Sequence, residues 1–163
     1  MNSLPEDLSE WLIELNLSDC VTSLQKNMVL AFVDGTLIAN IIHRTFPRLI
    51  LLQSYEETSN VSKRTTNWQL LNRKVLNVLQ CELGNEDISK IVSRNIQRGA
   101  IIIFLRLLRT KLEAYQSVYD KKQRKLAQEQ KFKRDNFKTI IDKQQEKKRA
   151  SVHKTLEEMN LEN

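Results

Sequence analysis

Apolar residues recur along the first 115 positions with the three-to-four-residue spacing of amphipathic helices. The first such stretch runs from about Pro5 to Leu15, and Pro5 suits the first turn of a helix. A second stretch follows Asp34, a good N-cap residue. It should stop near Phe46, because Pro47 disfavours helical geometry in the residue before it. Both stretches therefore predict helices that pack against a common core.

A third helix is expected after a long connection over residues 47–65. Thr65 or Thr66 should cap it, and it should run from Asn67 to about Leu79. Its expected apolar stripe comprises Trp68, Leu71, Val75, Val78 and Leu79. The spacing of this stripe predicts that Trp68 is a core anchor.

Two more helices complete the expected bundle. A short one should begin at Asn85, its cap, and a strongly apolar one should run from about Ala100 to Leu112. A helix that is apolar nearly all round belongs at the centre of a bundle. The apolar run is too short to span a membrane, since a span needs about 20 residues. No strand periodicity competes, so the sequence predicts an all-α fold with four main helices.

The composition changes after Tyr115. Residues 116–163 are rich in Lys, Gln, Glu and Arg and contain no Gly or Pro, so a helix should continue through them over about 72 Å. Two rows of residues run along this expected helix with 11-residue spacing. One row is Tyr115, Leu126, Phe137, Lys148 and Met159, and the neighbouring row is Tyr119, Gln130, Ile141 and Val152. Such spacing suits a nearly straight helix. Polar residues break both rows, which leaves a coiled coil, a helix laid on a partner and partial disorder as alternatives.

Composition argues against catalysis and cofactor binding. The chain has 3 Gly, widely separated, so no glycine-rich phosphate loop can be assembled. Its 2 Cys and 2 His lack metal-ligand spacing, and no catalytic triad or carboxylate pair stands out. The sequence therefore predicts a protein without enzymatic activity, cofactor or metal.

Charge is unevenly spread along the chain, whose net charge is +6. Residues 1–59 carry 3 basic and 8 acidic side chains, residues 60–115 carry 10 and 4, and residues 116–163 carry 13 and 8. This polarity suggests a basic face that could meet a polyanionic surface. The alternative is ordinary solvated helix faces.

Several segments together resemble a known family. They are Trp11, Phe32-Val33-Asp34-Gly35-Thr36-Leu37-Ile38-Ala39 with Phe46-Pro47, Asn67-Trp68 with Leu71-Asn72-Arg73-Lys74-Val75-Leu76, and Leu107-Leu108-Arg109-Thr110-Lys111-Leu112-Glu113. They are similar to the calponin-homology (CH) domain of the sperm-flagellar, microtubule-associated type, the CLAMP family. The resemblance covers roughly residues 4–115. The block around Asn67 and Trp68 is its most specific part.

The resemblance implies a CH domain over residues 1–115 and a basic helical extension over residues 116–163. It implies binding to tubulin, with stabilisation or cross-linking of microtubules, and residence on the cytoskeleton of the cytoplasm, in axonemes of cilia or flagella. The extension would meet other axonemal proteins or form a coiled coil with a second copy. It implies no catalysis and no cofactor.

Relatives carry a basic cluster just before the Phe-x-Asp-Gly segment, whereas this chain has only Lys26 there. We therefore expect weaker or re-oriented contacts. The candidate microtubule-binding residues are Lys26, Lys63, Arg64, Arg73 and Lys74. Lys63 and Arg64 are expected in a polar loop before the third helix, and Arg73 could instead hold the fold together.

Actin and nucleic acid are the alternative partners for such a basic helical protein. Actin binding or an adaptor role is open to the same fold, because a fold does not fix its partner. Nucleic-acid binding by the basic tail is disfavoured, because aromatic side chains are few there and no base-reading motif is present. Neither nucleic acid nor a membrane is an expected partner.

Overall fold

The computed structural model describes residues 3–162, and helices dominate this part of the chain while no strand occurs in it. The α-helices are α1 (Glu6–Glu14), α2 (Ser18–Lys26), α3 (Met28–Phe32), α4 (Thr36–Thr45), α5 (Val61–Leu71), α6 (Asn85–Val92) and α7 (Arg98–Leu161), with a 3₁₀ turn η1 (Leu52–Ser54) and a π-helical segment η2 (Asn72–Leu76). The all-α prediction is confirmed. The chain divides into two compact units, one ending at Gln116 and one starting at Ser117. Residues 1, 2 and 163, which the expected domains include, lie outside the described residues.

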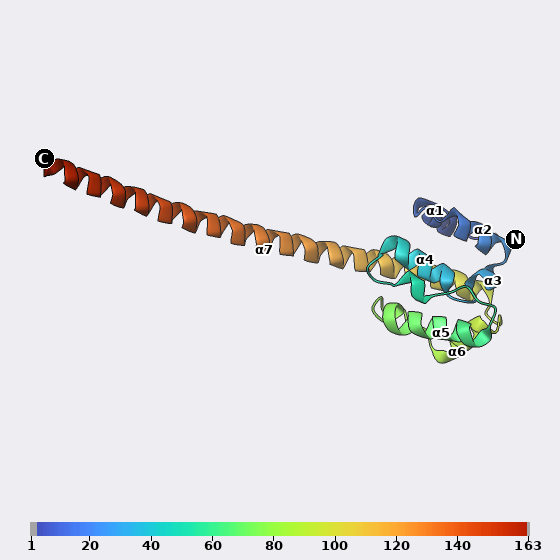
Figure 1. The fold of residues 1–163 in the computed structure, drawn as a ribbon. Coiled ribbons are helices and arrows are strands. Elements are labelled where there is room, and N and C mark those ends of the chain that lie inside the picture. Colours follow the sequence, from blue (N-terminus) through green and yellow to red (C-terminus); the bar gives the residue numbers. More distant parts are fainter. Residues whose placement is uncertain (1–2, 163) are drawn as a thin grey trace. The chain divides into compact units, whose positions relative to one another are not determined.

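The first unit is a helical bundle built around α4 and the beginning of α7. These two elements lie between α1 and α2 on one side and α5 and α6 on the other (Figure 1). Phe104 of α7 packs against both α3 and α5. Its ring lies 5.7 Å from that of Phe32 in α3 and 6.4 Å from that of Trp68 in α5. The expected central position of the apolar helix is therefore confirmed, with Ile101, Leu105 and Leu108 fully buried.

The first helix has the expected extent and the expected buried face. Pro5 precedes it, and Glu6 and Asp7 occupy its first turn, where negative charge suits the positive end of the helix dipole. Leu8, Trp11 and Leu12 are buried. Trp11 is thus a core residue of the bundle.

Two short helices, α2 and α3, were not anticipated. Only Val21 and Leu24 of α2 are buried, so its apolar signal is weak. A capping signal marks the start of α3, because the side chain of Asn27 accepts a hydrogen bond from the N–H of Leu30 at 3.1 Å. These helices supply one wall of the groove described below.

The third predicted helix begins earlier than expected and changes its geometry midway. Asn60, not Thr65 or Thr66, is its cap, and its side chain accepts from the N–H of Lys63 at 3.1 Å. After Leu71 the backbone becomes the π-helical segment η2. A π segment adds a residue to the turn and shifts the side chains beyond it, so Leu76 is buried and Val78 is 50% exposed. The predicted place of Val78 in the apolar stripe is therefore wrong.

The two remaining predicted helices are present with shifted starts. Gly84, not Asn85, is the residue before α6, while Ile88, Ile91 and Val92 form its buried face. The helix α7 starts at Arg98 and continues without interruption to Leu161. In the second unit, the described side chains are exposed except those of Tyr119 and Asp120, which are half-buried. The expected helicity of the basic extension is thus confirmed over the described residues.

Candidate binding surface

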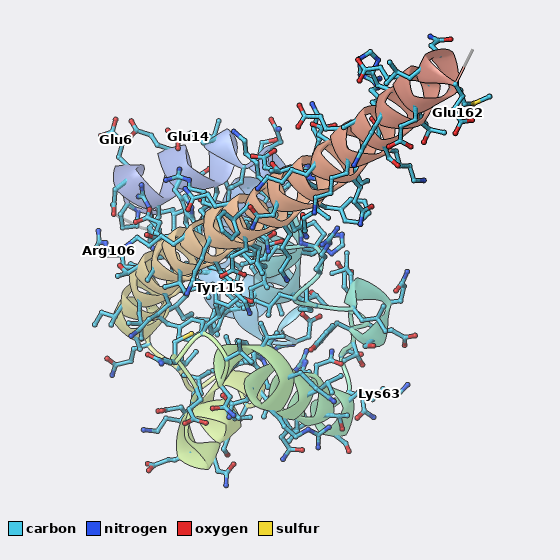
Figure 2. All side chains as sticks on the ribbon, turned by 90° about the vertical axis from the view of Figure 1, so that its left-hand side faces the viewer. Glu6, Glu14, Lys63, Arg106, Tyr115 and Glu162 are labelled. Carbon is cyan, nitrogen blue, oxygen red and sulfur yellow. The ribbon has the colours of Figure 1, made fainter. Side chains whose placement is uncertain are left out.

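The candidate residues do not share one environment. Lys26, Lys63, Arg73 and Lys74 are exposed. Among residues 3–162, no carboxylate lies within 4 Å of any of these four cationic groups. Figure 2 shows Lys63 on α5 pointing away from the bundle. All four side chains are therefore free to meet an external anion.

The placement of Arg64 corrects an expectation. Arg64 lies in the first turn of α5, not in a polar loop, and is only 5% exposed. Its Nε donates to the carbonyl oxygen of Thr58 at 3.0 Å, and its Nη1 donates to that of Val92 at 3.5 Å. It joins the connection before α5 to the end of α6, and a flat filament surface could not reach it.

Arg73 makes no hydrogen bond or ion pair with residues 3–162, and it acts on its surroundings through its charge. Burial raises the pKa of the Tyr55 hydroxyl, and the positive charge of Arg73 nearby opposes that rise in pKa. Arg73 and Lys74 are adjacent in η2, one turn beyond the end of α5. Because both are exposed, the π-helical segment presents two neighbouring positive charges to solvent.

A groove brings Lys26 and Arg64 together with Arg94. Its volume is about 840 Å³, and its walls come from α2, α3, the start of α4 and residues 57–59. Arg94 lies just beyond the C-terminal end of α6. Its backbone has a positive φ of 62°, and the N–H of Asn95 closes the end of α6 by donating to the carbonyl of Lys90 at 2.8 Å. Lys63, Arg73 and Lys74 do not line this groove.

Three other arginines are used within the first unit to fix α1. Arg106 pairs with Asp7 through two hydrogen bonds of 3.0 and 3.1 Å, which lower the pKa of the Asp7 carboxyl. Arg109 donates to the backbone oxygen of Asp7 at 3.3 Å and lies over the ring of Trp11. Arg98 donates to the backbone of Ser3 at 3.4 Å. Arg106 is therefore a paired residue of the fold.

Residues of the most specific sequence block hold the fold together. Asn67 donates to the carbonyl oxygens of Asp34 at 3.0 Å and Glu56 at 2.9 Å. Asn72 contacts both the N–H and the carbonyl of Leu83. The carboxylate of Asp34 accepts from Thr36 and Thr58, so it organises the start of α4 although Gly35 is the residue that precedes the helix. This block therefore defines the fold, and exposed cations near it are the candidate contacts.

Side chains suited to catalysis or metal binding do not cluster in the described part of the chain. No group of three or more His, Cys, Asp or Glu residues within 3–162 could hold a metal ion. Cys20 and Cys81 are free, and burial raises the pKa of the Cys81 thiol to about 11. His43 is half-buried in α4, and its Nδ1 is buried without a hydrogen-bond partner.

Within 3–162, none of the helices combines the length and the apolar character needed to cross a bilayer.

Comparison with known proteins identifies the family. Residues 8–110, more than half of the chain, match the family described as the CH-like domain in sperm protein. The chain belongs to this CH-like family, as the resemblance of its segments predicted. No solved structure matches it.

Relatives include sperm flagellar protein 1 from three vertebrates. The Xenopus laevis protein is 32% identical over 95 residues, which are 58% of this chain and 41% of the relative. The Bos taurus and Mus musculus proteins are each 32% identical over 92 residues, 56% of this chain and 38% of each relative. The chain thus spans about two fifths of the length of these relatives.

Proposed function

We propose that this protein is a structural component of cilia or flagella that binds microtubules through its CH-like domain. It would reside in the axoneme and stabilise or cross-link microtubules without catalysis. The relatives named sperm flagellar protein 1 support the flagellar location. The observation that carries the proposal is the set of four exposed, unpaired cations in a domain of this family: Lys26, Lys63, Arg73 and Lys74.

Electrostatics explains why several cations are needed. The microtubule surface is acidic, and a single exposed ion pair contributes only about 0–1 kcal/mol. Four free cations in the first unit can act together, whereas Arg98, Arg106 and Arg109 are already bound within the fold. Attachment should therefore weaken as salt screens these contacts.

The second unit would add a distributed contact. Residues 116–163 contain 13 basic side chains, and the described ones are exposed. Because this helix is covalently tethered to the domain, it would raise the effective concentration of positive charge at the lattice. Its apolar rows would meet a second copy or another axonemal protein.

Co-sedimentation with microtubules tests the proposal. Replacing Lys63, Arg73 and Lys74 with Glu should reduce the pelleted fraction by at least about tenfold while leaving the far-ultraviolet circular dichroism unchanged. Arg64 stays unchanged in this variant, because a buried Glu would destabilise the domain. The matched control replaces Arg44, Arg48 and Lys90 with Glu, which changes the net charge equally.

The comparison of the two triple variants is decisive. Retained pelleting of the first variant would show that the proposed residues are not the contact. Equal loss in both variants would show that only net charge matters. A parallel assay with filamentous actin addresses the alternative partner, and pelleting with actin but not with microtubules would reject the proposal.

A further inference from the structure

Arg64 is a buried cation without a counterion. It is 5% exposed, and no carboxylate among residues 3–162 lies within 4 Å of its guanidinium group. Its hydrogen bonds to Thr58 and Val92 use Nε and Nη1 and reach only neutral carbonyl oxygens. Buried charges in proteins are normally paired, because removing an ion from water is costly. This arginine therefore lacks the anion that such a site usually holds.

One carboxylate of the groove, that of Asp34, already accepts hydrogen bonds from neutral donors. Asp34 lines the same groove, and one of its oxygens accepts from the N–H and the hydroxyl of Thr36. The other oxygen accepts from the N–H of Thr58 at 3.2 Å. The carboxylate thus orders the Thr58 segment that Arg64 also binds. Within residues 3–162, Arg64 donates through Nε and Nη1 and makes no hydrogen bond through Nη2. The free nitrogen belongs to a side chain that lines the groove.

The groove has the size and mixed lining of a peptide site. Its volume of about 840 Å³ lies in the range of roughly 300–1,000 Å³ typical of ligand sites. Leu30, Ala31 and Leu37 give it an apolar wall, and Leu30 is 44% exposed. Lys26 and Arg94 add positive charge at exposed positions, while Asp19 and Glu57 add negative charge. This balance disfavours a uniformly acidic ligand.

We propose that this groove binds a peptide segment that presents one or two carboxylate side chains beside an apolar one. A glutamate or aspartate of the peptide would pair with Arg64, and the apolar side chain would cover Leu30. A guanidinium group suits this role because its planar donors match a carboxylate. The proposal goes beyond filament binding, since the groove contains only Lys26 of the four proposed filament contacts and excludes Lys63, Arg73 and Lys74.

A peptide titration followed by NMR tests this site in the full chain. The probe is a Gly-Ser decapeptide with a central Glu-Leu-Glu, and the control peptide carries Gln-Leu-Gln. The first should shift the backbone amide signals of Leu30, Thr58 and Arg94 with a Kd below about 1 mM. The control peptide should bind at least tenfold more weakly. Equal binding of the two peptides would overturn the proposal without any change to the protein.

Protein variants locate the contact. Arg64→Met keeps an unbranched apolar stem but removes the guanidinium group with its charge, and should weaken binding of the acidic peptide at least tenfold. Lys63→Met, at the adjacent exposed position, should change it less than twofold. Should Arg64→Met fail to fold, Arg94→Gln at the exposed margin is used instead, with an expected loss of about threefold. An unchanged Kd in the folded variant would reject the site.

Two further measurements distinguish a peptide site from a simple anion site and from filament binding. Alkylation of Cys20, which lines the groove, should slow when the acidic peptide is bound. Inorganic phosphate at the same concentration should shift the amides much less, and an equal response to phosphate would indicate a simple anion site and overturn the peptide proposal. The titration contains no filament. Loss of peptide binding with normal microtubule pelleting would therefore reject the groove alone, and the reverse result would reject only the proposed function.

Discussion

The indole Nε1 of Trp68 donates a hydrogen bond to the carbonyl oxygen of Val33 at 3.0 Å. This contact connects α5 to the turn between α3 and α4, which lies 35 positions earlier in the chain. The indole is fully buried, and its ring lies 5.0 Å from that of Phe32. The two sequence blocks that identify the family therefore meet inside the bundle.

Truncation of Trp68 should show how much this contact contributes to the free energy of unfolding. Trp68→Ala is expected to lower the free energy of unfolding by about 3–5 kcal/mol, because it leaves a large cavity and an unpaired carbonyl. Val78→Ala, at a half-exposed position, should change it by less than about 0.5 kcal/mol. Urea denaturation measures both values. A nearly normal midpoint for Trp68→Ala would contradict the packing described above.

Gly35 and Gly99 should respond to alanine with opposite signs. Gly35 has a φ of +77°, and a Cβ there would lie 3.4 Å from the ring of Trp68. Gly35→Ala is expected to destabilise the domain by about 1–2 kcal/mol, because the left-handed conformation strains an L-residue. Gly99 lies in α7 with open space around it, so Gly99→Ala should stabilise by up to about 1 kcal/mol. Thermal unfolding of the two variants checks the signs.

The sequence predicted those helices whose buried faces are long and periodic. The stripe of α1 and the apolar run of α7 are clear because several buried side chains recur at helical spacing. The helix α2 has only two buried residues, and the first turn of α5 precedes the Trp68 stripe. The prediction of a buried Val78 assumes a regular α-helical period through residues 67–79. The π-helical segment breaks that period, and Val78 is therefore exposed.

For the candidate site, the sequence does not predict which basic side chains are exposed. Lys63 and Arg64 are adjacent basic residues, and sequence alone gives them the same expected exposure. Their separation depends on the carbonyl oxygens of Thr58 and Val92, which come from segments on either side of α5 in the chain. Arg94 enters the groove only because α6 ends beside it. Long-range packing therefore decides which cations are free, and composition cannot.

The Asp7–Arg106 pair should make stability depend on pH in the acid range. Hydrogen bonding to Arg106 lowers the pKa of Asp7 below its ordinary value of 3.8. A carboxyl group with a depressed folded-state pKa stabilises the protein above the unfolded-state pKa, and this contribution is lost as the pH falls through the folded-state value. Asp7→Asn should therefore be less stable than the unmodified protein at neutral pH, with the difference closing below about pH 3.8.

Denaturant midpoints measured across this pH range check the expectation. Glu10→Gln is the matched control, because Glu10 is an exposed acid on the same helix and forms no ion pair with the described residues. Its difference from the unmodified protein should stay small at every pH. A difference for Asp7→Asn that stays constant from neutral to acid pH would contradict the role of the charged pair.

The exposed apolar rows of the second unit offer a test of self-association. Phe137 is 64% exposed and Ile141 36% exposed, and their four-residue spacing places them on one face of α7. Phe132 is 67% exposed but lies about 140° around the helix from Phe137. Phe132 is therefore an aromatic residue about as exposed as Phe137 that lies outside the 11-residue rows.

If these rows pair with a second copy, Phe137→Glu combined with Ile141→Glu should place charge inside the shared seam and shift the full chain from dimer to monomer in sedimentation velocity. Phe132→Glu should leave the dimer intact, because its side chain faces away from the seam. Burial of an unpaired carboxylate explains the expected loss. A sedimentation coefficient that is unchanged by the double substitution, or equally reduced by Phe132→Glu, would mean that the rows do not join two copies.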